Sequence, residues 1–121
     1  MGIKIQKYSR LVNTNYYFSK RMHNLGIPKQ YTAYYYLMDI MDLLINQNKS
    51  VKSFSREVYP EIAIKYNKTD CTVERDIRCV INVFWEKSLK NSLSDFWHYE
   101  RKPRCREFIY LLKNYLIMDI A

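Results

Sequence analysis

Glycine and proline are scarce in this chain, with two glycines and three prolines among 121 residues. Strands joined by tight turns need both residue types, because glycine supplies positive φ and proline fixes φ near −65°. Helices need them only at their ends. Hydrophobic residues make up 48% of the chain, which is enough to build one core at this length. The sequence therefore predicts a single all-α domain.

Apolar residues at spacings of three and four predict a compact bundle of about six helices. The helices are expected at about residues 15–25, 28–46, 51–66, 70–87, 92–97 and 106–117. Gly26 and Pro28 end the first helix, and Pro60 kinks or restarts the third. The aromatic residues within the second helix have helical spacing, so we interpret them as core rather than as a cofactor pocket.

The net charge of +8 lies mostly near the N-terminus. The first 30 residues contain no acidic side chain and six basic ones, Lys4, Lys7, Arg10, Lys20, Arg21 and Lys29. Such an excess attracts polyanions without distinguishing DNA from RNA or anionic lipid. We expect residues 1–13 to be a basic arm before a domain at 14–121. The arm either lies along a nucleic acid or is solvated and disordered.

Several classes of function are disfavoured. Cys71, Cys79 and Cys105 lack CxxC spacing, and His23 and His98 have no neighbouring ligands at metal spacing, so neither a disulfide framework nor a metal site is predicted. No uncharged run approaches the roughly 20 residues of a membrane span. There is no glycine-rich phosphate loop and no nucleophile paired with a base. We expect a reduced, cytoplasmic protein that is not an enzyme and uses no cofactor.

Residues 60–87 fit a helix-turn-helix, in which a short helix and a tight turn precede a helix that enters the major groove. Thr69 is suited to cap the second helix, and Asp70 suits the positive end of its dipole. One side of this helix is predicted to be core. It carries Val73, Ile77, Val80, Ile81, Phe84 and Trp85.

The opposite side of that helix carries Glu74, Arg75 and Arg78, with Cys71 and Asn82 alongside. Arg offers paired donors to guanine, and Glu accepts from cytosine N4, so these three side chains are suited to reading double-stranded DNA. The other interpretation is a solvated face, on which Glu74 and Arg78 form an i,i+4 ion pair worth about 0.3 kcal/mol.

Phosphate contacts are expected around this helix and from a basic segment near residue 104. The expected phosphate-contacting residues are Lys68, Thr69, Thr72, Asn82, Lys102 and Arg104. Arg101 and Arg106 belong to the same basic segment. The alternative interpretation is that this segment is a solvated loop that makes no phosphate contacts.

Four blocks resemble the C-terminal DNA-binding domain of the stage-zero sporulation response regulator of endospore-forming Firmicutes. They are LGIP at 25–28, VYPEIA at 58–63, VERDIR at 73–78, and KP with EFI at 102–109. The similarity covers about residues 14–118. It implies a six-helix fold, tandem binding to boxes of the TGTCGAA kind, and base contacts by a Glu-Arg-x-x-Arg motif that matches Glu74, Arg75 and Arg78.

Thr72, Asp76 and Cys79 depart from the family, which has Arg, Ala and His at these positions, so site preference and phosphate contacts are expected to differ. Only about 13 residues precede the similar region, so we expect no phosphorylated receiver domain. The favoured hypothesis is a stand-alone transcription regulator. One alternative is an interaction module that pairs with or antagonises the full-length sporulation regulator without reading DNA. Another is non-specific binding of RNA or a membrane surface through the basic arm.

The family's tandem binding also implies assembly on DNA. We expect copies to bind adjacent boxes head to tail and to be mainly monomeric without DNA, because no long heptad seam is present. The last helix, with Tyr110, Lys113 and Asn114 beside its apolar stripe, is a candidate for one contact surface.

Overall fold

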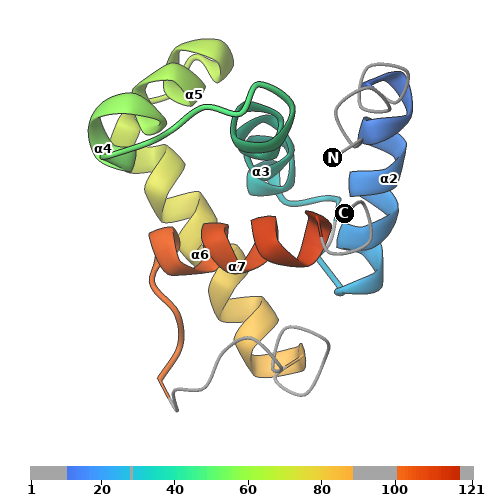
Figure 1. The fold of residues 1–121 in the computed structure, drawn as a ribbon. Helices are drawn as coiled ribbons and strands as arrows, with labels where there is room; N and C mark the ends of the chain where they lie inside the picture. Colours follow the sequence, from blue (N-terminus) through green and yellow to red (C-terminus); the bar gives the residue numbers. More distant parts are fainter. Residues whose placement is uncertain (1–10, 28, 89–100, 118–121) are drawn as a thin grey trace.

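The computed structural model describes residues 11–27, 29–88 and 101–117. Within them all regular structure is helical, and no strand occurs. The elements are α2 (Leu11–Asn24), α3 (Thr32–Met41), the π-helical turn η1 (Asp42–Asn46), α4 (Phe54–Glu57), α5 (Tyr59–Tyr66), α6 (Asp70–Ser88) and α7 (Cys105–Ile117) (Figure 1). This confirms the all-α prediction. The basic arm up to Arg10 and the helix expected at 92–97 lie outside the described residues.

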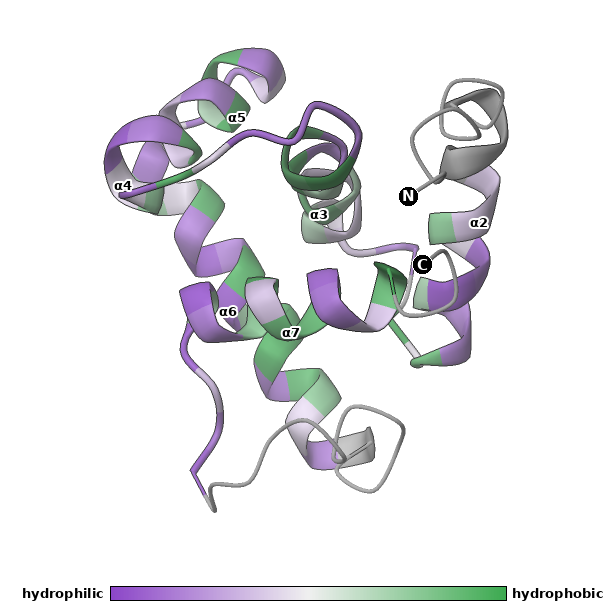
Figure 2. Cartoon of the chain, in the orientation of Figure 1, coloured by the Kyte–Doolittle hydropathy of each residue, from purple (hydrophilic) through white to green (hydrophobic). Residues whose placement is uncertain are grey.

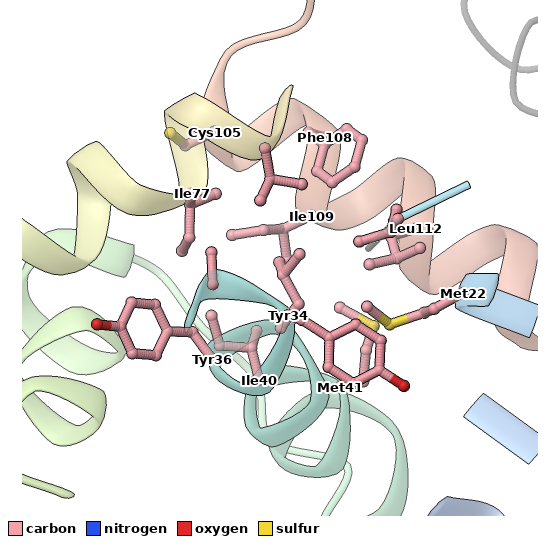
Figure 3. Packing of buried hydrophobic residues seen from close by; sticks show 14 of the residues in the cluster. Met22, Tyr34, Tyr36, Ile40, Met41, Ile77, Cys105, Phe108, Ile109 and Leu112 are labelled. Atoms are coloured by element: carbon pink, nitrogen blue, oxygen red, sulfur yellow. The ribbon is translucent and has the colours of Figure 1, made fainter. Parts of the chain in front are cut away.

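Helix α3 is the centre of the bundle. It packs against α6, α2 and α5, and α7 crosses α6 on one side of it (Figure 1). Tyr36, Leu37 and Ile40 of α3 are completely buried. Side chains of α6 and α7, among them Ile77 and Ile109, meet α3 there (Figure 3). Burial of a side chain of this size contributes roughly 1.5–3 kcal/mol, so this junction fixes how α6 and α7 sit on the bundle.

The first helix ends where the sequence predicts. Gly26 has φ of 82°, the amide of Ile27 donates to the Met22 carbonyl at 3.1 Å, and the amide of Gly26 donates to the His23 carbonyl at 2.9 Å. These two bonds form a Schellman motif, which satisfies carbonyls left free at a helix end. The start was predicted too late, because α2 already includes Leu11.

The second and third predicted helices are each split into two shorter elements in the structure, α3 with η1 and α4 with α5. The second does not begin at residue 28, because α3 starts at Thr32 after a turn. The third begins only at Phe54, and it breaks at Val58. Pro60 then lies in the first turn of α5, where its missing amide hydrogen costs nothing. The predicted restart at Pro60 is confirmed.

Helices α6 and α7 are amphipathic, with apolar residues toward the bundle and polar residues outward (Figure 2). None of the described helices combines the length and the apolar character that crossing a membrane requires. The buried sides of α6 and α7 hold these helices on the core, so their polar sides face outward in a fixed orientation.

Candidate nucleic-acid interface

A three-residue turn, Asn67–Thr69, joins α5 to α6. Asn67 is left-handed, with φ of 56°, which asparagine tolerates better than most residues. The amide of Lys68 donates to the Ala63 carbonyl at 2.8 Å, and that of Asn67 donates to the Ile64 carbonyl at 3.2 Å. This second Schellman motif makes the turn tight and fixes the direction in which α6 leaves.

The start of α6 is capped as predicted. The Thr69 hydroxyl oxygen accepts a hydrogen bond from the Thr72 amide at 3.1 Å, and the same hydroxyl donates to the Thr72 hydroxyl at 2.9 Å. Asp70 stands in the first turn, where its charge suits the helix dipole. The N-terminus of α6 is therefore rigid and exposed.

The predicted core side of α6 is buried. Val73, Ile77, Val80, Ile81 and Phe84 are each at most 6% exposed, whereas Trp85 is only half-buried. These residues fix which side of α6 is available to a ligand.

A polar contact on the flank of α6 was not predicted. The Tyr36 hydroxyl of α3 donates to the Asp76 carboxylate at 3.1 Å. Burial, and then this hydrogen bond, raise the pKa of Tyr36 to about 12. Asp76 stands where the resembling family has alanine, and the only signal in the sequence is its place between the core side and the outer side of the helix. Asp76 thus connects α6 to α3 through a hydrogen bond.

The outer side of α6 presents Glu74, Arg75 and Arg78. Arg75 is exposed, and the Glu74 and Arg78 side chains are 47% and 55% exposed. Arg78 lies 3.5 Å from the Glu74 carboxylate, which is the i,i+4 ion pair of the alternative interpretation. Exposed pairs of this kind contribute at most about 0.5 kcal/mol, so a ligand can replace the pair at little cost.

The basic segment after residue 100 is docked on α6. The Lys102 ammonium group donates to the Asn82 side-chain oxygen at 2.5 Å, and the Cys105 thiol donates to the Glu74 carbonyl at 3.7 Å. An open depression lies between the two segments. It is lined by Glu74, Arg78, Asn82, Lys102 and Arg104 among others. Residues predicted separately for base and phosphate contacts therefore meet at one surface.

Glu107 holds this segment in place. Its carboxylate accepts from the Arg104 amide at 2.8 Å, and from two nitrogens of Arg101 at 2.9 Å each. The bond to the amide before α7 is half of a capping box. The Arg101 hydrogen bonds, and then the Arg104 amide, lower the pKa of Glu107 to about 2.

The remaining expected phosphate contacts are distributed around the start of α6. Lys68 is exposed in the turn, and Thr69 and Thr72 are joined by the cap described above. Cys71 is also exposed on this side of the helix, whereas Cys105 is buried and its thiol pKa is raised by burial. The docking of Cys105 on Glu74 was not anticipated, because nothing in the local sequence indicates a contact between residues 31 positions apart.

A family model described as "Sporulation initiation factor Spo0A C terminal" matches residues 18–116. The matched range contains most of α2, the later described elements up to α7, and α7 except for Ile117; it includes the turn, α6 and the basic segment. The match therefore covers most of the chain and the whole surface described above. The chain belongs to the family of Spo0A C-terminal domains, which are effector domains that bind DNA and are not enzymes.

Proposed function

We propose that this protein is a sequence-specific transcription regulator that places α6 in the major groove of double-stranded DNA. In this proposal α5, the turn Asn67–Thr69 and α6 act as a helix-turn-helix, and the protein works in the cytoplasm. One observation carries the proposal. Helix α6 begins directly after a tight turn. Its side that carries Glu74, Arg75 and Arg78 is exposed, while its opposite side is buried.

The three side chains have complementary roles. Arg75 and Arg78 can each donate two hydrogen bonds to guanine O6 and N7, and Glu74 can accept from cytosine N4. In the free protein the Glu74–Arg78 pair holds both groups over the same turn of α6. When DNA binds, Glu74 and Arg78 each give up their mutual ion pair for a hydrogen bond to a base edge. Neither side chain is therefore buried with its charge unpaired.

Phosphate contacts would surround this base-reading surface. Lys102 and Arg104 stand on one side of α6, and Lys68 stands at its start. Thr72 accepts the hydrogen bond from Thr69, so its own hydroxyl hydrogen remains to be donated to a phosphate oxygen. Asn82 supports Lys102 and completes the expected set. Such contacts position the protein without specifying sequence.

Selection of bound duplexes from a random pool tests the proposal. The wild-type protein should enrich one short GC-containing box, and the Arg78→Ala protein should lose preference at one position of it. Competition with an unrelated duplex at about 0.15 M salt measures the preference. A pool that shows no enriched box, despite binding, would contradict sequence-specific reading.

A further inference from the structure

A second depression borders Glu74, on the side of α6 where α4 and the start of α7 meet. It lies between residues 52–55 and residues 104–106 and has a volume of about 250 Å³. We propose that it binds a backbone phosphate of the DNA strand beside α6, with Lys52 and Arg106 as the ligands not yet assigned. The inference rests on the proposed function, because it assumes that DNA lies against α6.

The polar side chains around this depression are cations and hydroxyl groups, with Glu74 as the carboxylate at its border. Its polar rim is formed by Lys52, Ser53, Ser55, Arg104 and Arg106. Ammonium, guanidinium and hydroxyl groups are donors to phosphate oxygens. Three cations gathered around one open hollow favour an anion with several oxygens as the ligand.

Among the described residues no carboxylate forms an ion pair with Lys52 or Arg106, although hydrogen bonds to neutral amides leave the charge of Glu57 in place. Glu57 accepts from the amides of Lys52 and Ser53 at 3.1 and 3.0 Å. Glu107 binds Arg101 and the Arg104 amide, and Glu74 pairs with Arg78. The ammonium group of Lys52 and the guanidinium group of Arg106 therefore keep their attraction for an incoming anion.

Arg106 lies near two aromatic rings in the free protein. Its guanidinium carbon lies 5.8 Å from the ring centres of both Phe54 and Tyr110, and these two rings are 5.5 Å apart. Both distances from the guanidinium carbon are within the roughly 6 Å range of cation–π attraction, which favours positions of the guanidinium group near the rings while leaving its N–H donors available. Less side-chain entropy is then lost on binding than for a freely rotating arginine.

The position of the depression argues for DNA phosphate over a small free anion. Glu74 lines both this depression and the one that contains Lys102, so cations flank Glu74 in both. A helix in the major groove has sugar-phosphate backbone on either side of it. The depression is also open, which suits a phosphate held in a polymer.

The test uses Lys52→Gln and Arg106→Gln, which remove one charge each and keep most of the side-chain stem. Lys20→Gln is the matched control, because Lys20 is exposed on α2, on the opposite side of the bundle from α4 (Figure 1). Binding of the selected box and of an unrelated duplex is measured over a range of salt concentrations. Melting curves check that all variants fold.

We expect the double variant to make the slope of log K against log salt less steep by about 0.9 on both duplexes, because one phosphate is no longer neutralised, and each single variant to reduce it by no more than that. The control should leave the slope unchanged. Methylphosphonate placed at single positions beside the box should identify one phosphate whose neutralisation weakens the wild type several-fold and the double variant not at all.

The outcomes separate the two proposals. Wild-type slopes in both variants, with a normal box preference, would overturn the phosphate site and leave the proposed function standing. Reduced slopes without any box preference would uphold the phosphate site and overturn sequence-specific reading. If Lys20→Gln reduced the salt slope as much as the test variants do, net charge and not a local contact would be responsible. That result would overturn the phosphate site.

Discussion

At the scale of single residues, Arg75 separates base reading from simple attraction. It is exposed on α6, and an Arg75→Lys protein keeps the charge while losing the planar pair of donors. Both Arg75→Ala and Arg75→Lys should weaken binding of the selected box by roughly 1–3 kcal/mol. Only the alanine variant should also bind unrelated duplex more weakly. Equal losses on both duplexes in the lysine variant would argue against a base contact.

The Tyr36–Asp76 hydrogen bond offers a residue-scale test of how α6 is held. Tyr36→Phe and Asp76→Ala should each lower the free energy of unfolding by about 1 kcal/mol, since one hydrogen bond is lost. The double variant should lose little more than either single one, because both remove the same bond. Urea unfolding of all four proteins measures this, and additive losses would show that the two groups act independently.

At the scale of elements, Glu107 makes a contribution to the stability of the fold that depends on pH. Its pKa is about 2 in the folded protein and about 4.5 without these contacts, so the unfolded chain binds the proton more readily between these values. The stabilisation is thus complete above about pH 4.5 and is lost as the pH falls toward 2. Glu107→Gln should be less stable than wild type near pH 6, and the difference should shrink by about pH 3. Denaturant unfolding at both pH values is the measurement, and a constant difference would contradict the pair.

The cysteines provide a test of α6 as the DNA-facing element. Cys71 and Cys79 are exposed, whereas Cys105 is buried. At 100° per residue, Cys71 lies between Arg78 and Arg75 around the helix. Iodoacetamide should therefore modify Cys71 and Cys79 rapidly in the free protein, and saturating DNA should protect Cys71. Mass spectrometry of the peptides gives the rates, with Cys105 as the internal slow standard. Unchanged Cys71 reactivity in the complex would place DNA elsewhere.

The elements also show which structural features local sequence determines. Helix α6 was predictable, because a threonine cap, a polar break and an apolar stripe of helical period all lie within residues 67–87. Gly26 and Pro60 likewise act on their own neighbours. The contacts of Lys102 with Asn82 and of Tyr36 with Asp76 span 20 and 40 residues, so they depend on how the helices pack. Grouping of the candidate base and phosphate contacts is a result of tertiary structure.

At the scale of the whole molecule, the first and last described helices, α2 and α7, are in direct contact. The Arg21 guanidinium of α2 donates to the Tyr115 carbonyl at 2.9 Å and lies 4.0 Å from the centre of the Tyr115 ring. Helix α7 in turn contacts α6, so α2 is connected to the candidate DNA surface through α7.

Head-to-tail assembly on DNA is the prediction that belongs to this scale. In such an arrangement two different surfaces meet, and DNA raises the effective concentration of two copies that are too weakly attracted to pair in solution. Of the candidate residues on α7, Tyr110 packs against Phe54, whereas Asn114 is exposed and Lys113 is partly exposed. These last two are therefore the better candidates for contacting a neighbour.

We expect a monomer in sedimentation of the free protein and cooperative binding to a duplex with two boxes in direct repeat. Moving one box by about five base pairs places the second copy on the opposite side of the duplex, because one helical turn is about 10 base pairs. Cooperativity should then vanish, while each box still binds. Lys113→Ala with Asn114→Ala should reduce cooperativity without weakening binding to a single box. A stable dimer without DNA, or independent filling at every spacing, would contradict the tandem arrangement, because a contact that depends on DNA geometry must respond to that geometry.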